Sequence, residues 1–174
     1  CIIINQKKKM KKILYLFLTV SLIFSSCAKE EGCTDSQATN YNSDAEEEDE
    51  SCTYSLVGVW EWQSATQNGT NVLVGVDNAY SFFWANGDYG QEYYAGGMLT
   101  RYTTGSYTIS GQSSFTMTDI GYTPDGTGGW IADAAPASQT FSITKINSNE
   151  LDGVDAVNNV NVNMGKSTRS LSEF

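Results

Sequence analysis

Cysteine carries the most distinctive chemistry of this sequence, because the 174 residues include four cysteines and no histidine. Without histidine, neither a Ser-His-Asp triad nor a Cys-His pair can be built. Glu61 and Glu92 could act in principle as the paired carboxylates of a glycosidase. Glu61 alternates with Trp60 and Trp62, however, and is expected to face water. The glycine-rich stretches also lack the Lys-Ser/Thr of a phosphate-binding loop. We therefore expect a protein that is not an enzyme and that has no cofactor.

Cys27 follows a short apolar segment that is typical of a secretory signal peptide. A basic start leads into 12 apolar residues, Ile13 to Phe24, and two serines then precede Cys27. This run is too short to cross a bilayer as a helix, which takes about 20 residues. We predict that residues 1–26 are a signal peptide, of which the part before Met10 is an upstream extension.

The ending Phe24-Ser25-Ser26-Cys27 resembles the lipobox of bacterial lipoproteins, whose cysteine is acylated and becomes the new N-terminus. The next residues, Ala28-Lys29-Glu30-Glu31, resemble the signal that sends Bacteroidota lipoproteins to the outer face of the outer membrane. These resemblances imply a lipidated tether over residues 27–31 and a membrane anchor at Cys27. They also imply an outer-membrane location facing the cell exterior, with the periplasmic face as the alternative.

The charge of the chain is unevenly distributed. All 20 acidic residues follow Cys27, whereas only half of the ten basic residues do. Removal of the signal peptide would therefore change the net charge from −10 to about −15. A surface this acidic repels phosphate backbones, which excludes nucleic acid as a partner. It also repels anionic membranes, so that attachment depends on the acyl chains.

Cys33 and Cys52 are the two thiols that remain once Cys1 is assigned to the upstream extension and Cys27 to lipid. Two thiols without histidine cannot complete a zinc site of the Cys/His type, and an exported protein can form disulfides. A bridge would close a loop of about 20 residues and contribute roughly 3 kcal/mol. The surrounding sequence resembles the GCTDxxAxNYNxxAxxDDGSCxY module of secreted and surface proteins of Bacteroidota. We expect an acidic, disulfide-closed module over residues 32–54.

The acidic residues of this module suggest a calcium site, which the spacing does not support. Asn40, Asn42 and Asp44 alternate like the first ligands of an EF-hand loop. Ala45 and Ser51 occupy the positions of the required glycine and of the bidentate glutamate, which excludes an EF-hand. Another geometry could still hold a hard cation, but a solvated spacer is the interpretation that we favour.

From Leu56 onward, short stretches of alternating apolar and polar residues are separated by turn signals, and no helical period is found. This pattern predicts about eight to ten strands joined as neighbouring hairpins. Such a meander avoids exposed edges by closing into a small antiparallel up-and-down β-barrel. A long loop is expected over residues 121–136, and one expected strand places three valines on one face. The hairpin dipeptides are Asn68-Gly69, Asn86-Gly87, Gly96-Gly97 and Ser110-Gly111, and the valines are Val72, Val74 and Val76.

Gly58-Val59-Trp60 resembles the GxW signature of lipocalins, and residues 82–89 and 105–111 resemble strand motifs of Bacteroidota lipocalin-like lipoproteins. The resemblance implies an all-β, lipocalin-like barrel domain over residues 55–174. In that family the tryptophan plugs the closed end of the barrel, and an arginine from the last strand packs over it. Trp60 would be the barrel plug, and Arg169 is the only arginine late in the chain.

Two non-catalytic functions are compatible with this sequence. The barrel could bind a small hydrophobic ligand, because eight-stranded barrels can enclose one. Alternatively, the domain is a surface-exposed interaction module for glycans or proteins, and the same aromatic side chains fill its core. The candidate ligand-binding residues are Trp62, Tyr80, Phe82, Trp84, Tyr107 and Phe115.

Overall fold

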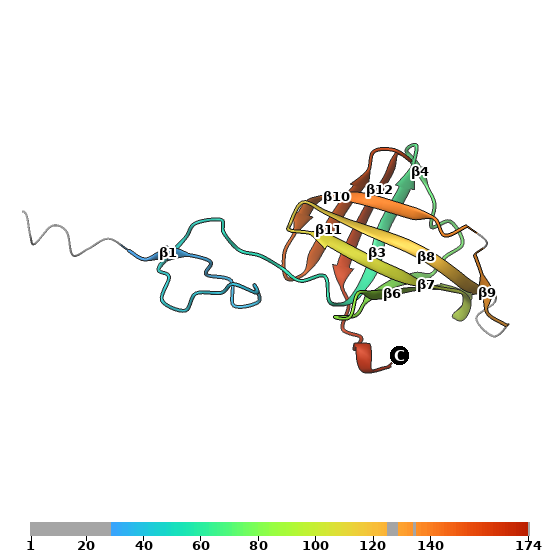
Figure 1. The fold of residues 1–174 in the computed structure, drawn as a ribbon, viewed down its shortest axis with the longest axis horizontal. Helices are drawn as coiled ribbons and strands as arrows, with labels where there is room; N and C mark the ends of the chain where they lie inside the picture. Colours follow the sequence, from blue (N-terminus) through green and yellow to red (C-terminus); the bar gives the residue numbers. More distant parts are fainter. Residues whose placement is uncertain (1–28, 125–128, 134, 174) are drawn as a thin grey trace, which may run out of the picture. The chain divides into compact units, whose positions relative to one another are not determined.

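The computed structural model describes residues 29–124, 129–133 and 135–173, which form two compact units (Figure 1). The first unit contains residues 29–36 and 41–52, and the second contains residues 37–40 and everything from Thr53 onward. The predicted signal peptide and Cys27 lie outside the described residues. In the described part of the chain, no helix is long and apolar enough to span a membrane.

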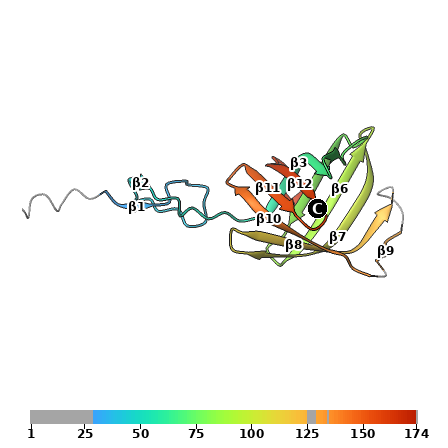
Figure 2. The ribbon, with the colours of Figure 1, turned by 90° about the horizontal axis from the view of Figure 1, so that it is seen from above.

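The second unit is built on eight antiparallel strands that close into a barrel (Figures 1 and 2). Each of these strands pairs with the next one along the chain, and the last pairs with the first, so that the ladder is continuous. The predicted all-β, up-and-down barrel is thus confirmed. The eight strands are β3 (Gly58–Gln67), β5 (Asn78–Phe83), β6 (Asp88–Ala95), β7 (Met98–Ser110), β8 (Ser114–Pro124), β10 (Ser138–Ile146), β11 (Glu150–Asp155) and β12 (Val160–Lys166).

Two further strands and one short helix complete this unit. The two-residue strands β4 (Thr70–Asn71) and β9 (Ile131–Ala132) pair with β3 and β8. The 3-10 helix η2 (Leu171–Glu173) follows β12 near the end of the chain. Because β8 continues to Pro124 and pairs with β9, the expected loop over residues 121–136 is shorter than the sequence predicted.

Turn chemistry explains both a correct and a wrong prediction between β3 and β5. Asn68 and Gly69 have φ values of 52° and 77°, as a tight hairpin turn requires. The expected valine strand does not form, because the Asn71 side chain accepts a hydrogen bond from the backbone NH of Leu73 at 2.9 Å. This local bond turns the chain away from the sheet and leaves Val74 79% exposed.

Aromatic side chains form much of the core inside the barrel. Phe83 contacts Tyr107 edge-on, with ring centroids 4.9 Å apart, and Phe115 stacks on Phe141 at 5.1 Å. Such pairs add to the stabilisation that burial alone gives. The fully buried members of this cluster include Leu56, Trp60, Ala65, Phe83, Tyr89, Phe115, Phe141, Leu151 and Met164.

The first unit is closed by the predicted disulfide between Cys33 and Cys52, whose Cα atoms lie 4.8 Å apart. Strand β1 (Glu31–Gly32) pairs in parallel with β2 (Glu47–Glu48). The Glu48 carboxylate accepts two hydrogen bonds of 2.8 Å from Thr34, one from the backbone NH and one from the hydroxyl. These bonds lower the pKa of Glu48. The carboxylate is therefore used within the unit, beside cysteines that are already bonded to each other.

Replacing both bridging cysteines by serine should loosen the first unit alone. We expect Cys33→Ser with Cys52→Ser to remove about 3 kcal/mol of stabilisation, because the open loop regains conformational entropy. The barrel has its own core and should retain its unfolding midpoint. Hydrogen exchange resolved by peptide measures both units in one sample. An equal loss of protection in the barrel strands would contradict the separation into two units.

Candidate functional site

Trp60 lies in the core of the barrel, 1% exposed. Its indole NH donates a hydrogen bond of 2.7 Å to the backbone carbonyl of Leu56. The Lys166 ammonium lies 4.3 Å from the centre of the indole ring and donates to the carbonyl of Val57. Lys166 reaches this place because it ends β12 directly opposite Trp60 in the register. A cation from the last strand therefore covers the tryptophan, as the resemblance implies, but this cation is a lysine.

Arg169 was the wrong candidate for covering Trp60, because it lies beyond the end of β12. Its guanidinium packs 4.7 Å from the centre of the Tyr80 ring and forms a 3.0 Å ion pair with Glu92. Tyr80 pairs with Glu61 on one side and with Glu92 on the other. Glu61 and Glu92, which the sequence suggested as a possible catalytic pair, therefore lie on the same wall of the barrel. Arg169 neutralises the charge of Glu92.

The six predicted ligand-binding residues divide between the two faces of the barrel wall. Those on the inner face are Trp62, Tyr107 and Phe115, and all three pack in or against the core. The other three, Tyr80, Phe82 and Trp84, lie on the outer wall, because they alternate with the inward-facing Ser81 and Phe83. Phe82 is nevertheless fully buried, since Trp84 stacks on it and Arg169 lies 5.6 Å from its ring centre.

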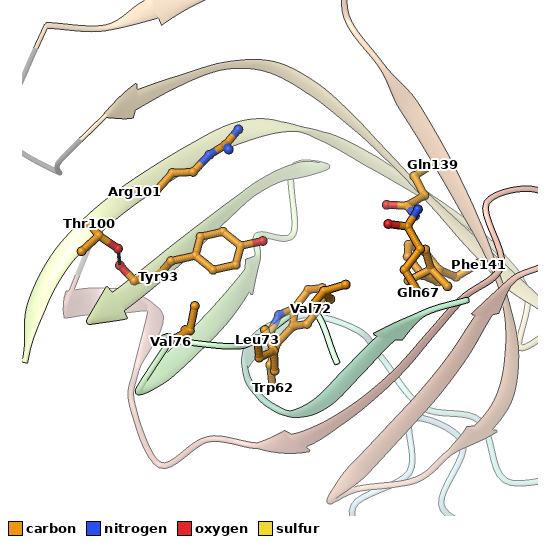
Figure 3. Close-up of a pocket in the computed structure, with 11 residues that line it drawn as sticks. Trp62, Gln67, Val72, Leu73, Val76, Tyr93, Thr100, Arg101, Gln139 and Phe141 are labelled. Atoms are coloured by element: carbon orange, nitrogen blue, oxygen red, sulfur yellow. Dashed lines mark hydrogen bonds between the residues drawn. The ribbon is translucent and has the colours of Figure 1, made fainter. Parts of the chain in front are cut away.

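A hollow of about 560 Å³ lies among β3, β6, β7, β10 and the connection from β4 to β5 (Figure 3). Its apolar lining residues include Trp62, Leu73, Val76 and Phe141, and Figure 3 shows Phe141 beside Gln67 and Gln139, apart from the other three. A second hollow of about 450 Å³ adjoins it and shares four of its lining residues. We refer to the two together as the lumen. Its polar lining residues include Gln67, Gln91, Tyr93, Arg101, Asp119, Gln139 and Asn158.

Hydrogen bonds hold the aromatic side chains of the lumen in place. The Trp62 indole NH donates to the Ser81 hydroxyl at 2.7 Å. Tyr93 donates to the Gln91 side chain at 3.1 Å, and its ring centre lies 6.5 Å from that of Trp62. Burial raises the pKa of Tyr93, so its hydroxyl remains protonated at neutral pH. These contacts fix an aromatic corner that a hydrophobic ligand could contact without rearrangement.

Arg101 is a lumen residue that sequence reasoning missed. Its guanidinium lies 4.7 Å from the centre of the Tyr122 ring and donates to the Thr103 hydroxyl at 3.3 Å. The ion pairs among the described residues involve Lys29, Lys145 and Arg169, so Arg101 is without a carboxylate partner there. The available signal was its isolation, since no other basic residue lies between Lys29 and Lys145.

Asp119 lines the lumen in a setting that disfavours its charge. Burial, and then the nearby Asp133, raise its pKa above the usual value of 3.8. The folded protein therefore binds this proton more tightly than the unfolded chain, and stability falls as pH rises through the raised pKa. We expect Asp119→Asn to raise the melting temperature at pH 7 and to lose this advantage in acid, below the usual pKa.

Thermal unfolding followed by circular dichroism at a series of pH values measures this effect. Asp133→Asn should shift the curve in the same direction by a smaller amount, because it removes only the secondary cause. A melting temperature of Asp119→Asn that stays equal to that of the parent protein at every pH would contradict the proposed cost of the charge.

Comparisons with known proteins yield no match, either to a protein-family model or to a curated protein sequence. The candidate site therefore rests on the geometry of this chain alone, without functional residues taken from a matching protein.

Proposed function

We propose that this chain is a lipid-anchored envelope lipoprotein whose barrel binds a small hydrophobic ligand, without catalysis, in the lumen. The observation that carries the proposal is the pairing of an apolar aromatic wall with an arginine that has no carboxylate partner among the described residues. A volume of about 560 Å³ lies within the range of small-molecule sites. The polar end of the ligand would lie beside Arg101.

The apolar part of the ligand would contact Trp62, Leu73 and Phe141, which face the hollow from three different segments. Each Å² of apolar surface removed from water contributes about 25 cal/mol, so a short alkyl chain gains several kcal/mol here. Arg101 adds a guanidinium that suits a carboxylate or a similar group.

Binding is tested with two probes of equal chain length and different head groups, dodecanoate and dodecanol. A change in the fluorescence emission of Trp62 is expected with both probes, because either chain would displace water from around the indole, and Trp62→Phe should abolish that change. Arg101→Met should weaken dodecanoate about tenfold, which corresponds to one charged hydrogen bond, and should leave dodecanol unchanged. If neither probe changes the emission, and no lipid is extracted from the purified protein, the alternative of a packed-core interaction module is favoured.

The lipoprotein part of the proposal rests on residues 10–31 of the sequence. Acylation of Cys27 would attach the protein to the outer membrane, with the barrel facing the cell exterior. The membrane would then be a partner of the protein through this lipid anchor. Cys27→Ala should release the protein from the membrane fraction. Ser26→Ala, which keeps a small residue before the cysteine, should leave the attachment unchanged. Retention of Cys27→Ala in the membrane would contradict the anchor.

A further inference from the structure

Three connections lie together at the end of the barrel where β3 finishes, away from Trp60, because neighbouring strands alternate in direction. The backbone NH of Asn68 donates to the carbonyl of Asn159 at 3.0 Å, and that of Gly97 donates to the Asp77 carboxylate at 3.1 Å. Hydrogen bonds therefore join the connections into one edge, which we call the rim. The rim comprises residues 68–77, 96–98 and 156–159.

The rim carries the three most exposed large hydrophobic side chains among the described residues. Val157 is 93% exposed, Val74 is 79% exposed and Met98 is 70% exposed. The turn that carries Val157 is fixed, because the buried Asp155 carboxylate accepts hydrogen bonds from the backbone NH groups of Val157 and Asn158, at 2.9 and 3.1 Å. Single exposed apolar residues are common in proteins, but their concentration on one edge indicates an interaction surface.

The rim also borders the lumen. Val72, Leu73 and Val76 belong to the first of its three segments, and all three line the larger hollow. Val74, in the same segment, is exposed instead. One short stretch of chain therefore contributes both to the wall of the lumen and to the apolar edge around it. A ligand that enters the lumen past this stretch would come from whatever surface the rim contacts.

The charge of the rim favours a neutral lipid surface as its partner. Asp77 is the one charged residue of the rim, and its carboxylate is bonded to the backbone of Gly97. Attraction to an anionic membrane requires lysine or arginine, which these segments lack. A protein interface would instead need a continuous, well-packed core that is rich in aromatic residues. Here the apolar side chains are non-aromatic and separate, and the asparagines between them can bind lipid head groups.

We propose that the rim inserts Val74, Met98 and Val157 into the head-group layer of a bilayer of lipids without net charge, and that hydrophobic ligands pass there between bilayer and lumen. Insertion removes apolar surface from water, which stabilises the contact. The passage of a ligand rests on the function proposed above. The contact itself requires no ligand and can be measured without one.

The test uses the purified full chain with isotope-labelled methyl groups of methionine, valine and isoleucine. The chain is mixed with phosphatidylcholine bicelles that carry a paramagnetic lipid. The methyl signals of Met98, Val74 and Val157 should lose most of their intensity. The signal of Ile109, which is 42% exposed near the opposite end of the barrel, should be retained. Because both ends belong to one molecule, this comparison does not depend on how the N-terminal segment attaches to lipid.

Two variants test whether the apolar side chains of the rim cause this orientation. Val74→Asn combined with Val157→Asn should restore most of the Met98 signal, and both positions are exposed enough to accept asparagine without loss of the fold. Ile109→Asn is the matched control and should leave the attenuation of Met98 unchanged. Equal attenuation at both ends, no attenuation at the rim, or full attenuation of Met98 in the double variant would overturn the proposal.

Other outcomes distinguish this proposal from its alternatives. Broadening of the rim signals with protein concentration, in the absence of lipid, would assign the rim to contact with a second copy and overturn the proposal. Failure of the rim to contact the bicelles, while dodecanoate still changes the Trp62 emission, would remove the contact and leave the binding function in place. Attenuation at the rim without any response of Trp62 would support the contact and overturn the passage of a ligand.

Discussion

Trp60→Ala should lower the free energy of unfolding by about 4 kcal/mol, the upper part of the range for a large aromatic residue removed from a core. The side chain is fully buried, its indole NH is bonded to the Leu56 carbonyl, and the Lys166 ammonium covers its ring. The substitution leaves a large cavity and removes the acceptor ring from a lysine whose pKa is already lowered by burial. Urea denaturation followed by circular dichroism measures the loss.

Two matched variants separate the contributions at this position. Trp60→Phe keeps a ring beneath Lys166 but loses the hydrogen bond to Leu56, and should cost about 1–2 kcal/mol beyond its volume change. Lys166→Met keeps the aliphatic cover without the charge and should cost less than about 1 kcal/mol. A loss below about 1.5 kcal/mol for Trp60→Ala would show that this end of the barrel is not organised around the indole.

Gly105→Ala should cost about 3 kcal/mol, a large effect for one methyl group. A Cβ atom here would lie 2.0 Å from the backbone carbonyl oxygen of Thr118 and 2.5 Å from the ring of Tyr89. The first contact is with backbone in the adjacent strand, so the clash cannot be relieved by a side-chain rotation. Relief requires a shift of β7 against β8, whose register is already irregular between Thr104 and Gly105. Thermal and urea unfolding both measure the effect.

Gly165→Ala is the matched control for this prediction. Gly165 lies in β12, and its Cβ atom would meet only the flexible side chain of Gln63, at 3.3 Å. Its substitution should change stability by less than about 0.5 kcal/mol. Equal costs at the two positions would indicate a general penalty for losing a strand glycine, and would contradict the close approach of β7 and β8 at Gly105.

The strands of the barrel could be predicted from sequence because period-two alternation and turn dipeptides are local signals. The strand predicted from the valines after Gly69 does not form, and the reason is equally local. The hydrogen bond from the Leu73 backbone NH to the Asn71 side chain competes with strand formation. The disulfide was predictable because Cys33 had only one partner once Cys27 was assigned to lipid.

The face that each aromatic residue occupies could not be predicted from alternation. Tyr80 and Phe82 alternate with Ser81 and Phe83, and both faces of β5 are hydrophobic. Alternation separates two faces without identifying the inner one. Phe82 was predicted as a lumen residue from this alternation, but it lies on the outer face, where Trp84 and the distant Arg169 cover it.

The lumen residues that the sequence did not reveal depend on contacts between distant segments. Arg101, Leu73 and Gln139 come from three different parts of the chain and meet only when the barrel closes. The identity of the cation over Trp60 depended similarly on the register of β12, which places Lys166 opposite the tryptophan. The resemblance implied that a cation covers Trp60, but it did not identify Lys166 as the residue that supplies this cation.

The most direct test of a binding lumen is the set of tryptophan indole NH resonances in a two-dimensional NMR spectrum during titration with dodecanoate. The chain has four tryptophans, which lie in different environments. Our account predicts that the Trp62 resonance moves progressively and saturates, while that of the core residue Trp60 remains in place. A spectrum in which Trp62 does not shift, or in which only Trp84 and Trp130 respond, would contradict a ligand inside the barrel.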